Sequence, residues 1–178
     1  MIILASGSPR RKEILKREGI EFKVIKPTLE EILNPELTVE EQVMELAKQK
    51  ALEIYQDHKE TIIAADTVVY LDDVILGKPV DDEHAFQMLS DLRDKVHYVL
   101  TGVCIIKNNK VETMYDKTKI IFNDYSDQEI IDYIKTKEPM DKAGAYAIQG
   151  LGNKLVKSYD GDFDNVVGLP INKIKEHL

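Results

Sequence analysis

The sequence has one cysteine and no long apolar run, and each scarcity excludes a class of protein. A lone cysteine, Cys104, excludes an internal disulfide framework and any metal site built from several cysteines. Because Cys104 lies in the apolar segment VCII, we expect it to be a buried structural thiol. No apolar run approaches the roughly 18 residues that suggest a membrane span, and no cationic segment precedes a long apolar stretch at the start. We therefore expect a cytoplasmic protein without a signal peptide or a membrane partner.

An excess of positive charge is also missing. The 178 residues include 24 Lys and Arg against 32 Asp and Glu, which gives a formal net charge of -8. Such an acidic chain is a poor candidate for general binding to nucleic acid or to anionic membranes. No repeat, low-complexity tract or Ser/Gly linker divides the chain, and its length favours one sizeable domain over two very small ones.

Helix and strand signals alternate along the chain and predict a mixed α/β domain with a long, mostly antiparallel sheet. N-cap and capping-box patterns predict helices over about residues 9–18, 39–55, 82–92 and 127–135, and after Pro170. Apolar and β-branched runs predict strands at about residues 2–5, 20–25, 61–65, 67–71, 96–107, 110–122, 143–150 and 153–159. Tight turns are expected at Asp72–Asp73 and at Asn108–Asn109.

The segment LASGSPRRKEIL places three cations in the first turn of a predicted helix. Ser8 is a good N-cap and Pro9 suits the first helical position. Arg10, Arg11 and Lys12 then fall where the helix dipole is positive and the backbone N–H groups are free, so cations are disfavoured there. An anion with several charges, such as a polyphosphate, would explain the pattern. The alternative is a solvated basic face.

Lys50 stands in the middle of the apolar stripe of the predicted helix over residues 39–55. It follows Val43 by seven residues and Leu46 by four, and it precedes Ile54 by four. Lysine is rarely buried without a partner, so we expect its ammonium to emerge into a cleft. The alternative is a stem packed on the core with the ammonium reaching bulk water.

Asp66 interrupts the run between IIAA and TVVYL, which favours a carboxylate at a strand end. It is a catalytic or metal-binding candidate, and the alternative is a turn residue bonded to nearby backbone.

Lys78 follows a glycine in LGKP and is a weak signal alone. Gln149 ends the small-residue segment DKAGAYAIQG, where an amide that donates and accepts suits the edge of a nucleobase; a satisfied strand-end amide is the alternative. Together these features favour a nucleotide-cleaving enzyme over a binding module.

Seven segments also resemble the motifs of one family, in order along the chain: SGSPRR, LAKQKA, AADTVV, GKP, TGV, DKAGAYAIQG and NVVGLP. This is the Maf family of nucleoside triphosphate pyrophosphatases, and the resemblance runs from Leu4 to about Ile171. It implies an elongated mixed sheet with flanking helices, similar to the inosine triphosphatases, as a single domain over residues 1–178 with two lobes around a central cleft. It also implies hydrolysis of a small-molecule nucleoside triphosphate to a monophosphate and pyrophosphate with a divalent metal, Mg²⁺ or Mn²⁺.

The resemblance further implies roles for single residues. Asp66 would accept the proton of the attacking water, and Glu31 and Asp66 would lie at the metal. The substrate-binding residues that it implies are Ser8, Arg10, Arg11, Lys50 and Lys78. The family was first linked to inhibition of septum formation, so a connection to cell division is implied beside nucleotide-pool housekeeping.

Three positions separate the two main branches of this family. Arg10, Thr67 and Gln149, in SPRR, ADT and IQG, follow the branch that acts on dTTP and UTP. The 7-methyl-GTP branch reads SPWRR-like, SDQ and SEG at these places. The chain departs from the family in lacking a Ser-Gly before TGV, which we expect to affect only a surface turn. A 7-methyl-GTP pyrophosphatase and a non-hydrolysing nucleotide sensor of septation are the alternatives. A homodimer is compatible with the chain.

Overall fold

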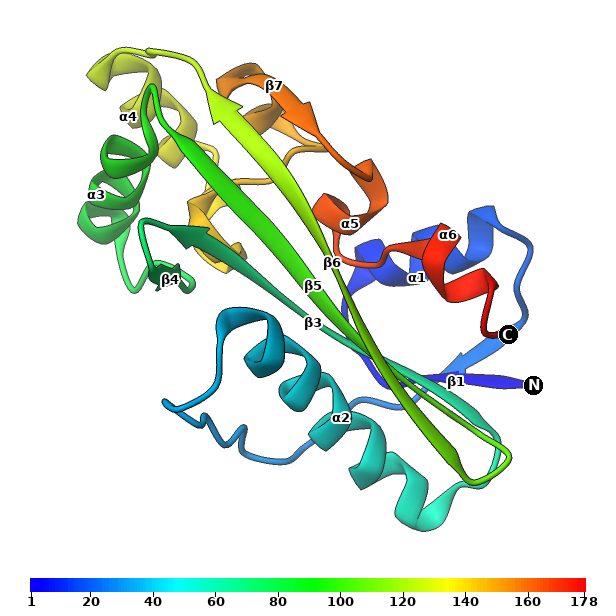
Figure 1. Ribbon diagram of the computed structural model, residues 1–178. Helices are drawn as coiled ribbons and strands as arrows, with labels where there is room; N and C mark the ends of the chain where they lie inside the picture. The colour runs from blue at the N-terminus through cyan, green and yellow to red at the C-terminus, as the bar shows by residue number, and fades with distance from the viewer. The chain divides into compact units, whose positions relative to one another are not determined.

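The computed structural model describes residues 1–178 (Figure 1). The α-helices are α1 (Pro9–Arg17), α2 (Val39–Asp57), α3 (Asp82–Leu92), α4 (Asp127–Lys135), α5 (Phe163–Val167) and α6 (Ile171–Lys175). The strands are β1 (Ile2–Leu4), β2 (Phe22–Val24), β3 (Thr61–Leu71), β4 (Val74–Leu76), β5 (Val96–Lys107), β6 (Lys110–Phe122) and β7 (Val156–Asp160). Three short 3₁₀-helices are η1 (Glu138–Asp141), η2 (Ala143–Ala145) and η3 (Leu151–Leu155). None of the helices has both the length and the apolar character that a membrane span requires.

The seven strands form one mixed sheet, as the family resemblance implies. Its order is β2-β1-β3-β5-β6-β7, with β4 paired to β3. β1 runs parallel to both β2 and β3, so that Ile3 lies opposite Lys23 on one side and Ile62 on the other. The β3–β4 and β6–β7 pairs are antiparallel.

The chain forms two compact units. The first unit comprises residues Met1–Thr67, Leu100–Asp116 and Phe163–Leu178. In its core the apolar face of α2 packs on strands of the sheet, and the buried residues are Ile3, Ala5, Ala47, Ala51, Ile54, Ile62, Ala64, Cys104 and Ile106. Cys104 is thus the buried thiol that its apolar run predicts, and burial raises its pKa to about 12.

The close approach of α2 to β5 depends on Gly102. A Cβ atom at this position would overlap the backbone of Val43 and lie 2.6 Å from the backbone nitrogen of Met44. The glycine of the TGV segment therefore sets how closely α2, which carries Lys50, packs on the sheet.

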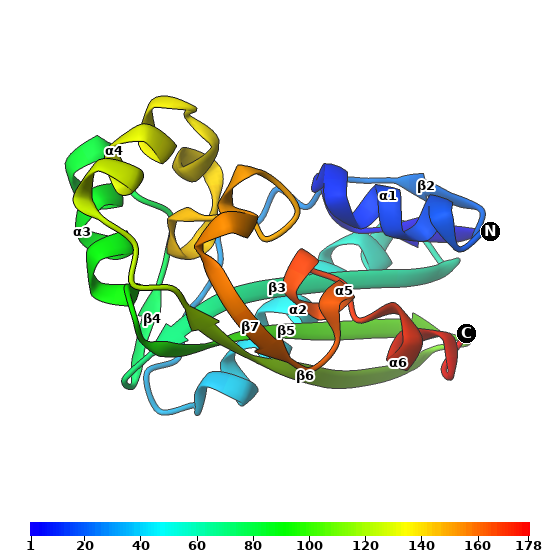
Figure 2. The ribbon, with the colours of Figure 1, turned by 90° about the horizontal axis from the view of Figure 1, so that it is seen from above.

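The second unit comprises residues Val68–Val99 and Lys117–Asp162. Within it, α3 and α4 lie side by side (Figure 2). Its core contains an aromatic cluster in which the Phe122 ring lies 4.6 Å from the rings of both His97 and Tyr146 in edge-to-face geometry. These centroid distances are typical of favourable aromatic pairs.

Local signals in the sequence predict most element boundaries correctly. Thr38 and Glu41 form the capping box that starts α2, and Ser126 and Glu129 form the one that starts α4. Asn108–Asn109 makes the hairpin turn between β5 and β6, with φ of 51° and 61°. These positive angles match the two-residue hairpin turns that favour asparagine.

Two structural predictions are wrong. Asp66 does not interrupt a strand, because β3 continues through it from Thr61 to Leu71. Residues 143–150 form no strand but a 3₁₀ turn followed by a hydrogen-bonded turn. Gly144 and Ala145 have φ of 68° and 62°, in the left-handed region, and extended backbone cannot continue through such residues. The sequence reading also missed the short elements β4 and α5.

Candidate active site

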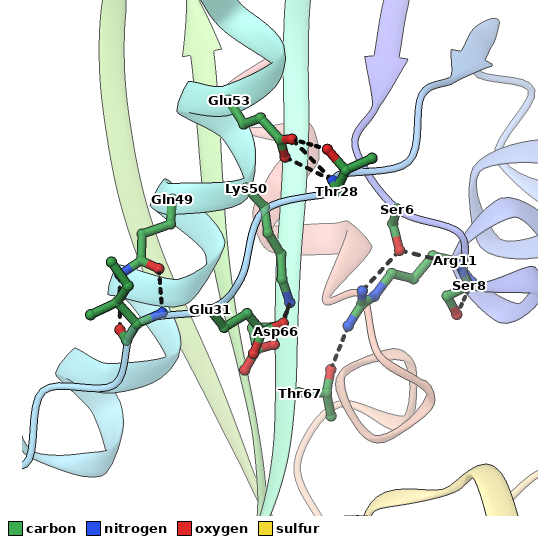
Figure 3. A network of polar contacts seen from close by, with 11 residues as sticks. Ser6, Ser8, Arg11, Thr28, Glu31, Gln49, Lys50, Glu53, Asp66 and Thr67 are labelled. Atoms are coloured by element: carbon green, nitrogen blue, oxygen red, sulfur yellow. Dashed lines mark hydrogen bonds and ion pairs between the residues drawn. The ribbon is translucent and has the colours of Figure 1, made fainter.

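Lys50 is held between two carboxylates. Its Nζ lies 2.6 Å from Oδ1 of Asp66 on β3 and 2.8 Å from Oε1 of Glu31 in the preceding loop (Figure 3). The Lys50 and Asp66 side chains are only 15% and 13% exposed, whereas Glu31 is 44% exposed. Lysine in the centre of an apolar stripe is thus accommodated by pairing, and its ammonium does not simply extend into bulk water.

A row of polar side chains on α2 fixes the loop that carries Glu31. The Gln49 side-chain amide donates to the carbonyl of Ile32 and accepts from its N–H, both at 3.0 Å (Figure 3). The Glu53 carboxylate accepts from the backbone N–H of Thr28, at 3.0 Å, and from its hydroxyl, at 2.6 Å. The hydroxyl bond from Thr28 is the main reason that the pKa of Glu53 is lowered.

Sequence reasoning missed these anchors. Gln49 lies inside the LAKQKA segment and Glu53 follows four residues later, so helical spacing places them on one face. That spacing was the available signal, but nothing in the sequence shows that their partners lie in the loop over residues 26–37.

Arg11 is held on three sides by uncharged acceptors. Its Nε donates to the carbonyl of Gly168 at 2.7 Å. Its two terminal nitrogens donate to Ser6 Oγ and to Thr67 Oγ1, each at 3.0 Å (Figure 3). A guanidinium bound only to neutral oxygens keeps its full positive charge uncompensated by direct contact. Such an arrangement fixes a cation in place for an anionic ligand.

The hydroxyl of Thr67 is oriented by a chain of bonds. Thr101 Oγ1 donates to the carbonyl of Asn165 at 3.0 Å and lies 2.9 Å from Thr67 Oγ1. Since the single Thr101 proton is used on Asn165, Thr67 donates to Thr101 and presents its lone pairs to Arg11. Thr67, predicted as a specificity position, therefore orients Arg11 in this structure.

The start of α1 concentrates positive charge, as the opening segment suggests. Ser8 caps the helix by accepting from the N–H of Arg11 at 3.5 Å, and the Ser8 N–H donates to Ser6 Oγ at 3.3 Å. Burial lowers the pKa of Arg11 to about 10; the charge of Asp66 opposes this, and that of Arg10 adds to it. Arg11 stays protonated at neutral pH, and no hydrogen bond or ion pair holds Arg10. A bound anion would relieve the repulsion between the two guanidinium groups.

The other two predicted site residues belong to the second unit. Lys78 and Gln149 are both exposed and have no hydrogen-bonded partner. The N–H of Gly144 donates to the carbonyl of Gly77 at 3.1 Å, so the LGKP segment and the segment that leads to Gln149 are joined within this unit.

Glu31 and Asp66 are suitable in kind and number to be the protein ligands of a magnesium or manganese ion. No group of three or more His, Cys, Asp or Glu side chains is assembled as a closed metal cage. Mg²⁺ is commonly bound by one or two carboxylates, with water and substrate phosphates as its other ligands. Two carboxylates beside a cationic helix start match that pattern, and the cation of Lys50 already lies between them.

Comparison with known proteins identifies the family. The model of the Maf-like protein family matches residues 1–178. The chain belongs to the Maf family. Of the seven Maf segments, SGSPRR supplies Arg11, LAKQKA supplies Lys50, and AADTVV supplies both Asp66 and Thr67. These are the residues that the first unit brings together in one polar network.

Curated Maf relatives cover nearly all of the chain. A protein of Caldicellulosiruptor bescii named dTTP/UTP pyrophosphatase is 49% identical, over 97% of this chain and 90% of its own length. Proteins of the same name from Halalkalibacterium halodurans and Acholeplasma laidlawii are 48% and 46% identical, over 97% and 100% of this chain and 91% and 95% of their own lengths. Among solved structures, a HAM1 protein from Coxiella burnetii matches with a TM-score of 0.57 and 14% identity, over 99% of this chain and 96% of that one. This last likeness concerns the fold alone.

Proposed function

We propose that this protein hydrolyses nucleoside triphosphates, with dTTP and UTP preferred, to the monophosphate and pyrophosphate. The observation that carries the proposal is the network around Lys50: two carboxylates on one ammonium, beside a half-buried arginine at a helix start. The name shared by relatives up to 49% identical supports the choice of substrate. We include in the proposal a single domain over residues 1–178, a cytoplasmic location and a role in nucleotide-pool housekeeping.

The cations are proposed to bind the triphosphate. Arg10 and Arg11 lie at the start of α1, where the positive end of the helix dipole adds to their attraction for phosphate. Lys50 and Lys78 are the further phosphate ligands in this proposal. Donors held in place before the substrate arrives stabilise charge that moves onto the leaving pyrophosphate in the transition state.

Asp66 is proposed as the proton acceptor. Water attacks the α-phosphorus, its proton passes to an Oδ atom of Asp66, and the bond from the α-phosphorus to the bridging oxygen breaks, so that pyrophosphate leaves with the electron pair. Glu31 and Asp66 would hold the divalent metal, Mg²⁺ or Mn²⁺. When bound, such a cation supplies neutralisation of the phosphate charge and lowers the pKa of coordinated water.

Gln149 is proposed to face the base. Thymine and uracil each present an N3–H donor between two carbonyl acceptors, and a primary amide can both donate and accept. Its exposed side chain has no partner in the protein and is free for such contacts. Arg10 and Thr67 complete the proposed specificity positions.

Pyrophosphate release from a panel of nucleoside triphosphates tests the proposal. We expect pyrophosphate and monophosphate from dTTP and UTP at similar rates, and slow hydrolysis of 7-methyl-GTP. Orthophosphate as the main product would refute cleavage at the α-phosphorus. A preference for 7-methyl-GTP would assign the chain to the other branch, and tight nucleotide binding without turnover would identify a sensor.

Gln149→Glu tests the base contact separately. Replacing an amide donor with a charge that faces carbonyl oxygens should lower kcat/KM for dTTP and UTP at least about tenfold, because a buried polar mismatch is costly. Gln56→Glu, the same change at an exposed position on α2, serves as the control. Equal kcat/KM values in both variants would remove Gln149 from the proposed site.

A further inference from the structure

Two side chains of the second unit hold the turn that follows Ala147 at both of its ends. Glu138, at the start of η1, accepts from the backbone N–H of Leu151 through Oε1 at 3.1 Å and from that of Gly152 through Oε2 at 3.0 Å. The hydroxyl of Tyr133 on α4 donates to Glu138 Oε2 at 2.5 Å and accepts from the N–H of Ala147 at 3.1 Å. One carboxylate and one phenol therefore connect three backbone N–H groups of a seven-residue segment, 147–153.

The glycines of this segment fit against the same two side chains. A Cβ atom at Gly150 would overlap the carboxylate of Glu138. At Gly152 it would lie 2.6 Å from the hydroxyl of Tyr133, which is fully buried. Each glycine thus permits a close approach that any other residue would prevent. The turn is packed against its anchors as well as hydrogen-bonded to them.

Gln149 is the part of the turn that these anchors leave free. Its neighbour Ile148 accepts at its carbonyl from Asn153 Nδ2 at 3.2 Å. Further back, the Tyr146 hydroxyl lies 2.7 Å from Nε2 of buried His97. The backbone on both sides is fixed, whereas the Gln149 side chain is exposed and has no protein partner.

We propose that Glu138 and Tyr133 are positioning residues for base selection: they fix the turn so that the amide of Gln149 meets the base in one orientation. This inference rests on the proposed function, in which Gln149 faces the base. A side chain whose backbone is already fixed loses less conformational entropy on binding, and so discriminates better between bases. A carboxylate has two oxygens that accept these three bonds, whereas a glutamine has one oxygen and turns an N–H₂ group toward donors.

The test compares UTP with ribose 5-triphosphate, which has no base. The ratio of the kcat/KM value for UTP to that for ribose 5-triphosphate measures how much the base contributes to catalytic efficiency. In Glu138→Gln and Tyr133→Phe we expect this ratio to fall at least tenfold, mainly through a higher KM for UTP, with hydrolysis of ribose 5-triphosphate within twofold of wild type. Glu83→Gln, the same change at an exposed position on α3, should leave both substrates unaffected.

A third variant covers the case in which Glu138→Gln or Tyr133→Phe does not fold. Leu151→Pro removes one N–H donor to Glu138 at the first residue of η3, where proline is tolerated, and Leu151 is 57% exposed. Leu151→Pro should also lower the ratio of kcat/KM for UTP to kcat/KM for ribose 5-triphosphate. Folded variants that keep the wild-type ratio, or that lose both substrates equally, would overturn the positioning role. If wild type hydrolyses UTP no better than ribose 5-triphosphate, the proposed base contact itself fails, and this inference fails with it.

Discussion

Lys50 and Asp66 form an ion pair, with 2.6 Å between Nζ and Oδ1, in surroundings that leave each side chain less than one-sixth exposed. Glu31 binds the same ammonium from the solvent side at 2.8 Å. An ion pair in such a site is costly to break on one side only, because the remaining charge stays poorly solvated. A change at Lys50 should therefore affect both the stability of the fold and the proposed activity.

Lys50→Ala should lower kcat/KM at least tenfold, which corresponds to about 1.4 kcal/mol of transition-state stabilisation. The reason is loss of a phosphate ligand together with an uncompensated Asp66 carboxylate. Steady-state kinetics on dTTP measures the effect, with circular dichroism to verify the fold. Lys48→Ala, two residues away on α2, is the control. Normal turnover in Lys50→Ala would mean that the ammonium serves only the ion pair.

Asp66→Asn should keep the shape of the site and reduce kcat by about 10²-fold or more, the usual contribution of a positioned general base. The matched control is Asp72→Asn, since Asp72 has φ of 46° in an exposed turn, a conformation that asparagine adopts readily. Single-turnover release of pyrophosphate from dTTP provides the measurement. Turnover of Asp66→Asn within a few-fold of wild type would exclude Asp66 as the proton acceptor.

Gly102→Ala should destabilise the first unit, because the added methyl group overlaps the backbone of α2 at Val43. Overpacking of this kind costs about 1–3 kcal/mol. Urea denaturation of the variant should give a lower free energy of unfolding than wild type. Gly77→Ala introduces the same group where no atom lies within 4 Å, and it should change stability much less. Equal stability of the two variants would show that α2 can move away from β5 at little cost.

His97 should make the fold sensitive to acid. Burial lowers its pKa from the ordinary 6.5 to about 3. Between these pH values the unfolded chain binds a proton that the folded chain does not, so the free energy of unfolding falls as pH drops below 6.5, by up to about 1.4 kcal/mol per pH unit. Above pH 6.5 this contribution is fully present.

His97→Gln should remove this part of the pH dependence. Urea denaturation at pH 7, 6, 5 and 4 should give a shallower slope for the variant than for wild type, even if the variant is less stable at pH 7. The two proteins share all carboxylates, so the difference in slope isolates His97. Parallel slopes would contradict the assignment of the acid sensitivity to this residue.

Local signals in the sequence determined the starts of helices and the tight turns of this protein. The capping boxes at Thr38 and Ser126, and the turn at Asn108–Asn109, need only neighbours within a few residues, and the structure has them where they were predicted. The motif order identified the family for the same reason, because a motif is a local property of the chain. The central position of Lys50 in an apolar stripe predicted an ammonium that emerges into a cleft, but it did not indicate the two carboxylates that the ammonium binds.

Only the tertiary structure decided how those residues are used. Asp66 remains within a continuous strand because β3 lies inside the sheet and the ammonium of Lys50, from α2, compensates the carboxylate. The segment over residues 143–150 leaves the extended conformation that its composition suggested. Left-handed residues turn its backbone, and further along Glu138 and Tyr133 bind N–H groups that a strand would have paired with a neighbour. Which donor a carboxylate binds depends on which donors the fold brings within about 3 Å of it. The spacing of residues along the chain does not predict those distances.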